Sequence, residues 1–522
     1  MGEKTLPLLS RREIEASIAE GGKIFILDQF VIKANAWMPY HPGGDKTILH
    51  MVGRDATDEV TVLHSAETKQ QMSRYRVGRI QGGKFRPLSD DTDAEFDGDA
   101  VLSSASSDRS RGASPTFDSD HSALRHRGGR GGLPSSASVT SVSSVKDDGM
   151  AHLDSVTREK INLDLEKYPP VNLETQDAIV AKYRLLNDRI KAEGLYQCNY
   201  SAYAIEICRY ILLFACMLLL LHWGWYTLSG VLMGACWHQL VFAAHDAGHM
   251  GITQNFEIDT CIGIFIADFM GAYQSAERPR YRVPALPFLA ISHRFLGNLR
   301  STYYEHVMQY DAVAKFCLQF QKYSYYPLMT LGRFNLYRLS WGYLLSDHVP
   351  RKGPAWWHWY LEITGQVVFW TWYGYGIIYM FVPDTWGRIA FFMASHMIMA
   401  PLHVQFTLSH FAMSMADLGP HESFPQKMLR TTMDVDCPQW LDFFHGGLQF
   451  QAIHHLYLRI PRHNLRATQK LVQEFCEEVG IPYALYGFVD VNTQVVGRLA
   501  EVSRQAAILA KCQQVMASGG GH

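Results

Sequence analysis

The sequence predicts a small α+β domain tethered by a polar linker to an all-α membrane domain. Short β-type runs lie within the first 82 residues, Ser, Gly and Asp dominate residues 81–150, and long apolar runs follow residue 200. A chain of 522 residues has room for several such domains. The formal net charge of −2 disfavours a nucleic-acid partner, because no cationic excess is available to neutralise phosphates. Nine cysteines without a CxxC pair indicate neither a disulfide framework nor a zinc site.

Residues 8–82 form the predicted α+β domain. The short apolar runs Ile24–Leu27 and Phe30–Ile32 are typical of strands. Gly53–Thr57 is a turn of the kind that starts a helix. These elements predict a compact unit that precedes the linker.

Residues 83–150 form the predicted linker. Aromatic residues are almost absent there, so the segment buries too little apolar area to offset its ordering, and we expect it to be disordered. Residues 151–200 follow as a pre-membrane segment, in which Asp164–Glu193 combines helical periodicity with mixed charge and predicts an amphipathic helix. The membrane domain is expected over residues 201–500, and residues 501–522 are expected to form a C-terminal tail.

Four membrane-spanning helices are predicted in this last domain. Residues 210–245 contain no Lys, Arg, Asp or Glu, and the run is long enough for two spans once it is extended back to Tyr203. A turn between the two is expected near Trp223–Trp225. A second apolar region, Leu361–Phe411, is divided by the turn signal Val382–Thr385, which predicts another helical hairpin.

Basic residues indicate the orientation of these helices. The connection Arg278–Lys352 is rich in Arg and Lys, whereas both hairpin turns carry few. The positive-inside rule therefore places this connection and both termini in the cytosol. Cys261–Phe269 is too short to span a membrane and is expected to lie in the interface.

Two histidine motifs lie in this domain, the first of them at the end of an apolar run. His245 and His249 are four residues apart and therefore share one helix face. Gln451 precedes His454 and His455 by three and four residues, so the three side chains can converge. Imidazole-rich ligation suits iron that must activate oxygen. These five residues are the expected metal ligands.

Other residues are candidates to complete this metal site. Asp246 is expected to orient a ligating imidazole through a hydrogen bond. His410, at the end of the predicted fourth span, and His445, in a Phe-His-Gly-Gly stretch, are additional candidate ligands. His396, His403 and His410 recur at seven-residue steps, a spacing that is equally typical of helix packing.

The N-terminal motifs resemble the cytochrome b5 domain over residues 8–82. They are His41-Pro-Gly-Gly, Gly53-Arg-Asp-Ala-Thr57 and His64-Ser65. The resemblance implies a haem b cofactor with His41 and His64 as its ligands, and His50 remains a minor alternative. Two imidazoles must approach haem iron from opposite faces, and glycines let the backbone pass close to the porphyrin.

The later motifs resemble the cytochrome b5-fused front-end desaturases of membrane lipids. His245–His249 is similar to that family's first histidine box, and Phe444–Gln449 with Gln451–His455 is similar to its third box and the approach to it. Phe334–Arg338 and Arg459–Asn464 resemble the fungal sphingolipid Δ8 branch. The resemblance implies two iron ions, O2 as a substrate, and Δ8 desaturation of the sphingoid base of ceramides or other membrane sphingolipids.

The family's second histidine box is missing from this chain. Its place holds Gly271–Pro284, which contains no histidine, and the resemblance resumes at about Leu286. The next histidines, His293 and His306, stand thirteen residues apart. Loss of three imidazoles is expected to leave one iron site incomplete. The abrupt return to the family pattern favours a reading-frame error across residues 272–285 over a paralogue that has lost activity.

The resemblance also implies partners and a location. A NAD(P)H-dependent cytochrome b5 reductase would supply electrons to the haem, from which they would reach the iron pair. A multi-pass protein of this kind is expected in the endoplasmic reticulum, with its active site facing the cytosol. Two alternatives stay open: an acyl-lipid Δ6 or Δ5 front-end desaturase, and a catalytically inactive haem-binding electron carrier of the membrane.

Overall fold

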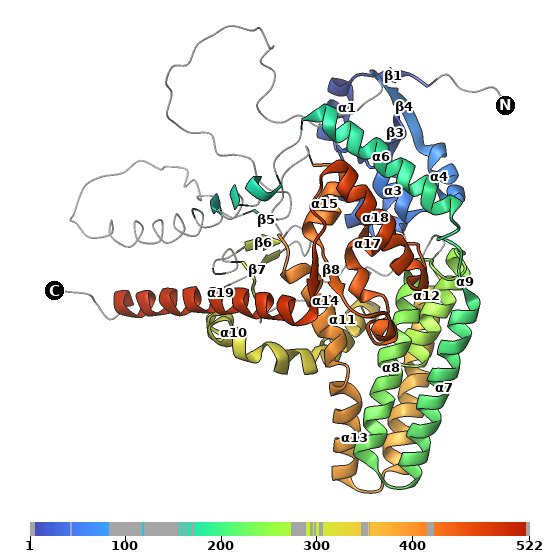
Figure 1. The fold of residues 1–522 in the computed structure, drawn as a ribbon, viewed down its shortest axis with the longest axis vertical. Coiled ribbons are helices and arrows are strands. Elements are labelled where there is room, and N and C mark those ends of the chain that lie inside the picture. The colour runs from blue at the N-terminus through green and yellow to red at the C-terminus, as the bar shows by residue number, and fades with distance from the viewer. Residues whose placement is uncertain are drawn as a thin grey trace, which may run out of the picture.

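The computed structural model is a small mixed unit of strands and helices that lies against one end of a large helical body (Figure 1). The structure describes residues 6–41, 44–82, 117–118, 155, 158–159, 162–163, 165–168, 172–272, 289–292, 296, 299–301, 306–308, 310–345, 353, 355–414 and 422–517. For these residues, the predicted combination of an α+β unit with a mostly helical domain is confirmed.

The N-terminal unit is built on a four-stranded sheet of order β1-β4-β3-β2. β1 (Leu8–Leu9) runs parallel to β4 (Arg76–Ile80), whereas β3 (Phe30–Lys33) runs antiparallel to both β4 and β2 (Ile24–Leu27). The β2–β3 hairpin closes through residues 28–29, which both have positive φ, the backbone conformation that a two-residue type I′ turn needs. Both strands of this hairpin lie where the apolar runs predicted them.

Helices cover both faces of this sheet, which explains why every residue of β2 is buried. Phe25 and Ile32 pack into a cluster with the helices on one face, while Ile14 of the first helix packs against the other. Ser10 starts that helix with a capping box to Glu13, which satisfies two backbone donors. The helical segments of this unit are α1 (Arg11–Ala19), η1 (Met38–Tyr40), α2 (Asp45–Leu49), α3 (Thr57–Leu63), α4 (Ala66–Met72) and η2 (Ser73–Tyr75).

Among the described residues, three helical stretches are long and apolar enough to cross a membrane. They are α7 (Tyr200–His222), α8 (Tyr226–Gly248) and the pair α13 (Thr385–Met397) with α14 (Ala400–Phe411). The predicted third span, which precedes the turn signal Val382–Thr385, is not recovered as one helix, because its hydrogen bonding changes from α12 (His358–Phe369) to the π-helix η5 (Trp370–Phe381). The chain turns near residues 223–225 and 382–385, as predicted.

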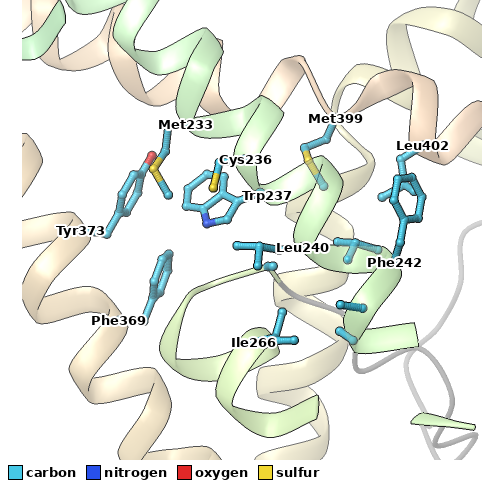
Figure 2. Close-up of a cluster of buried hydrophobic side chains, with 14 of the residues drawn as sticks. Met233, Cys236, Trp237, Leu240, Phe242, Ile266, Phe369, Tyr373, Met399 and Leu402 are labelled. Atoms are coloured by element: carbon cyan, nitrogen blue, oxygen red, sulfur yellow. The ribbon is translucent and has the colours of Figure 1, made fainter. Parts of the chain in front are cut away.

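The apolar helices pack closely because α8 presents small residues to α13. A Cβ atom on Gly230 would lie 2.5 Å from the carbonyl oxygen of Phe391, and one on Gly234 would lie 2.4 Å from that of Ser395. This G-x-x-x-G spacing lets two backbones approach, as in membrane helix pairs. Figure 2 shows the buried cluster beside this contact, in which Trp237 lies among methionine, leucine and aromatic side chains.

A cap of shorter elements covers the end of α8 that carries its C-terminus (Figure 1). The predicted amphipathic helix is α6 (Leu173–Ala192), which packs on α18 (Leu465–Val479). The predicted interfacial segment falls in α9 (Phe256–Ile264) and η3 (Phe265–Phe269), which pack on α8. The other elements around the cap are α11 (Gly332–Leu344), α15 (Phe424–Thr431), β8 (Asp434–Asp436), η6 (Gln439–Leu441), α16 (Asp442–His445), η7 (Leu448–Phe450), α17 (Gln451–Leu456), η8 (Arg462–Asn464) and β9 (Leu485–Gly487).

The C-terminal helix α19 (Phe488–Ala517) crosses the boundary that the sequence predicted at residue 500. Leu499 and Val502 lie on either side of this boundary, and both are buried in apolar clusters that include α10 (Ala312–Thr330). The helix therefore continues into the predicted tail, because its apolar stripe continues with the same helical spacing.

Several predicted segments fall largely outside the described residues. Of the predicted linker, the structure describes Phe117–Asp118, which form β5 and pair with β6 (Leu299–Ser301). β6 pairs in turn with β7 (His306–Met308). The predicted disordered linker therefore contains one short strand among its described residues. Residues 273–288, where the second histidine box is missing, and His293 lie outside the described residues.

Candidate haem and metal sites

His41 and His64 face each other in the N-terminal unit. His41 follows η1 and His64 ends α3, and their ring centroids lie 5.9 Å apart. The Nδ1 atoms lie 2.9 Å from the carbonyl oxygen of Gly44 and 3.1 Å from that of Val60, respectively. A ring nitrogen that faces a carbonyl carries the proton, so the lone pair of each neutral ring is on Nε2. This pair, rather than His50, has the arrangement that two haem ligands require.

Burial keeps His64 in its ligating form. Burial, together with the neighbouring His41, lowers the pKa of His64 to about 4. Its imidazole is therefore neutral near pH 7, and only a neutral imidazole can bind a metal ion. Gly44 has φ +90°, a conformation that other residues rarely adopt, and its carbonyl orients His41. The residues present thus fit a haem.

Three histidines from two distant segments form the most compact cluster of possible metal ligands in the described part of the chain. His245 and His249 come from the end of α8, and His454 comes from α17. One ligand nitrogen from each lies within 4.8 Å of the other two. Complete burial and the neighbouring imidazoles hold the pKa of His454 well below its usual range, so this ring is neutral. The donor set fits a transition metal such as iron.

Two glycines bring α17 to the end of α8. Gly446 and Gly447 have φ values of +59° and +93°, which favour glycine over residues with a side chain. A Cβ atom on Gly446 would lie 2.1 Å from the ring of Phe242 on α8. The close approach of this turn to α8 therefore depends on glycine. It positions His454 beside the first histidine motif.

A buried network of charged residues holds the same two segments together. Arg462 donates to Asp246 at 2.5 Å and also pairs with Glu206 of α7. His463 lies 3.0 Å from a second oxygen of Glu206. Tyr203 donates to Asp246. The described hydrogen bonds of Asp246 thus run to Tyr203 and Arg462, and neither partner is an imidazole.

Sequence reasoning gave no role to Glu206, Arg462 or Tyr203. Glu206 was visible as a charge at the edge of an apolar run, and a charge at such a position usually has a partner. The identity of that partner was not visible, because 256 residues separate Glu206 from Arg462. The network anchors the backbone between the two histidines of α8.

His455 and His410 lie beside the three-histidine cluster. The ring of His455 is nearly perpendicular to that of His454, with centroids 6.1 Å apart. The ring centroids of His410 and His455 lie 5.1 Å apart, and the amide nitrogen of Gln451 lies 3.1 Å from the Nε2 atom of His455. These three side chains form a second group of possible ligands.

The candidates His445 and His396 have contacts outside these two groups of histidines. His445 hydrogen-bonds the amide of Gln405. His396 stacks on Phe334 at 5.0 Å and hydrogen-bonds Tyr337 at 3.2 Å within a buried aromatic cluster. This placement supports the packing interpretation of the seven-residue stripe for His396.

Comparisons with known proteins place both parts of the chain in known families. A model of the cytochrome b5-like haem/steroid-binding domain matches residues 10–81, and a model of fatty acid desaturases matches residues 288–487. A Delta 8-(E)-sphingolipid desaturase of Emericella nidulans is 52% identical over 98% of this chain and 97% of its own length. A Delta 8-(E)-sphingolipid desaturase of Kluyveromyces lactis is 39% identical over 98% of this chain and 95% of its own length. An acyl-lipid (9-3)-desaturase of Borago officinalis is 31% identical over 63% of this chain and 76% of its own length.

Proposed function

The chain belongs to the membrane lipid desaturases that carry a fused cytochrome b5-like domain, and on this premise we propose that it introduces a Δ8 double bond into the sphingoid base of ceramides. The observation that carries the proposal is the 52% identity, over nearly the whole length of both chains, to an enzyme named for the Δ8 (E) product. The likeness to an acyl-lipid desaturase is weaker and covers only 63% of this chain. That difference favours a sphingolipid over an acyl-lipid substrate.

In this proposal each histidine group has a separate cofactor. His41 and His64 would hold haem b, which would supply one-electron transfer chemistry between a NAD(P)H-dependent reductase and the metal site. His245, His249 and His454 would hold one iron ion, and the group around His455 would supply ligands toward a second. Bound iron supplies the oxygen chemistry needed to attack unactivated methylene groups. The chain contributes ligand positions, a buried apolar surround and the exclusion of water.

We further propose that the chain crosses the membrane of the endoplasmic reticulum four times and has both termini in the cytosol. The third span along the chain is the continuous pair of α12 and η5, with 12 residues each. Together they exceed the ~20 residues that a span requires. The change to π-helical hydrogen bonding leaves the backbone donors satisfied within the segment, which is what a lipid environment demands. The basic connection between the two hairpins supports this orientation.

The absent second histidine box limits the activity expected of the sequence as it stands. Gly271–Pro284 offers no imidazole, so the second iron lacks ligands that the family pattern provides. We therefore expect one iron site to fill and the other to stay incomplete. This expectation separates the literal chain from a version in which an HxxHH segment is restored near residue 275.

The test is expression of both versions in a host without sphingolipid Δ8 unsaturation, followed by mass spectrometry of the long-chain bases and acyl chains. The restored version should form Δ8-unsaturated bases, and the literal chain should form little or none. Double bonds in the acyl chains instead would favour an acyl-lipid desaturase. A restored version with normal haem, full iron and no product would favour the inactive electron carrier. Full activity of the literal chain would refute the expectation of an incomplete site.

A further inference from the structure

The haem unit is docked on the cap through its helix α3. Asp58 accepts a hydrogen bond from Arg184 of α6 at 2.8 Å. Four residues further along α3, Val62 is buried in an apolar cluster with Tyr183 and Tyr457 of the cap. An ion pair and an apolar contact on the same helix fix the face that this unit turns toward the cap.

Both sides of the haem-ligand pair lie close to residues outside the haem unit. Next to His41, the side chain of Tyr40 lies against Gly353. A Cβ atom added to Gly353 would lie 3.2 Å from the Cβ atom of Tyr40. On the other side, the positive charge of Arg459 is near enough to His64 to act on its imidazole. Residues outside the haem unit therefore lie near both ligands.

Arg459 is a half-buried cation with few hydrogen-bond partners among the described residues. One terminal nitrogen donates to Gln254 at 3.3 Å, but the Nε atom is buried and has no hydrogen-bond partner among the described residues. A buried donor without a partner costs free energy, and the cost is greater for a charged group. The carboxylate of Glu67 lies within electrostatic reach but is fully exposed. Within the part of the chain that the structure describes, no buried carboxylate pairs with this guanidinium.

Haem provides an anion of the right kind. Its two propionates are carboxylates, and a guanidinium pairs with carboxylates through parallel, charge-assisted hydrogen bonds. We propose that Arg459 completes the haem site from the cap, with its guanidinium paired to a haem propionate. The inference rests on the proposed haem binding by His41 and His64. It makes the docking of the two units depend on the haem that lies between them.

This contact would also join the two cofactor sites through a short stretch of backbone. Arg459 follows His455 by four residues, which can span at most about 14 Å even when fully extended. A residue that holds the haem edge is thus tied to the segment that carries the metal-site histidines. Docking at Arg459 fixes the distance between the two groups.

The test measures haem loss from the full-length protein in detergent, by transfer to a haem-scavenging apoprotein followed by absorbance. Arg459→Gln should lose haem about tenfold faster, as expected for loss of a charge-assisted hydrogen bond. Its haem midpoint potential should fall, because a nearby positive charge favours the ferrous state. Arg338→Gln is the matched control: this exposed arginine of α11 bonds Asn335, and its loss should change neither quantity.

Three outcomes would count against the pairing. Unchanged haem loss and potential in Arg459→Gln, with normal haem in the unmodified chain, would overturn the inference and leave the proposed haem ligands intact. If Glu67→Gln reproduced the faster loss, the partner of Arg459 would be that carboxylate and the propionate pairing would be wrong. If the unmodified chain bound no haem, the proposed haem function would itself fail, together with this inference.

Discussion

Replacement of Arg462 by Met should destabilise the protein far more than the loss of an exposed arginine. The Arg462 side chain is 5% exposed and pairs with Asp246 at 2.5 Å and with Glu206. Its removal leaves two carboxylates buried without their cation, which should lower the free energy of unfolding by about 3–5 kcal/mol. Because Asp246 lies between His245 and His249, the variant should also lose bound metal.

The measurement is unfolding of the full chain in one detergent, with metal content determined by elemental analysis. Arg189 offers a matched control, because it also pairs with two carboxylates, those of Glu193 and Glu474. Its side chain is 52% exposed, however, so water screens both interactions. Arg189→Met should therefore destabilise the protein far less than Arg462→Met and leave the metal content unchanged.

A second set of variants tests the cause of the loss. If buried charge is responsible, adding Asp246→Asn and Glu206→Gln to Arg462→Met should recover part of the stability, because no uncompensated charge then remains. The reasoning is refuted if the two arginine variants cost the same, or if neutralising both carboxylates recovers nothing.

Three further predictions concern the cofactor ligands. His41→Ala or His64→Ala should abolish the low-spin haem spectrum; a spectrum that survives both changes would show that other residues ligate the haem. Because the pKa of His64 is lowered to about 4, protons should compete with haem for the folded protein only as the pH falls toward 4. The free energy of unfolding should already fall below about pH 6.5, because a histidine in the unfolded chain takes up a proton there. Haem loss centred near pH 6.5 in protein that remains folded would contradict the low pKa. His249→Ala should lower iron content while His396→Ala leaves it unchanged, and equal losses would mean that the stacked His396 is also a ligand.

The sequence by itself predicted several local features of this protein correctly. The two strands at Ile24–Leu27 and Phe30–Lys33, the apolar helices and the turns between them follow from short-range patterns of apolar and turn residues. The four-residue spacing of His245 and His249 likewise predicts one helix face. These features depend on neighbours within a few turns of chain, and such neighbours are visible in any sequence.

Only the tertiary structure decided which of these local faces meet. It joined His454 to His245 and His249, paired Arg462 with Glu206, and set His396 into an aromatic cluster although it shares a periodic stripe with His410. It also divided the third apolar stretch between α-helix and π-helix. The physical reason is that a periodic pattern specifies the direction of a side chain on its own helix. The partner on the other side of the contact is set by packing between segments tens to hundreds of residues apart in the sequence, such as Glu206 and Arg462, and no local pattern records it.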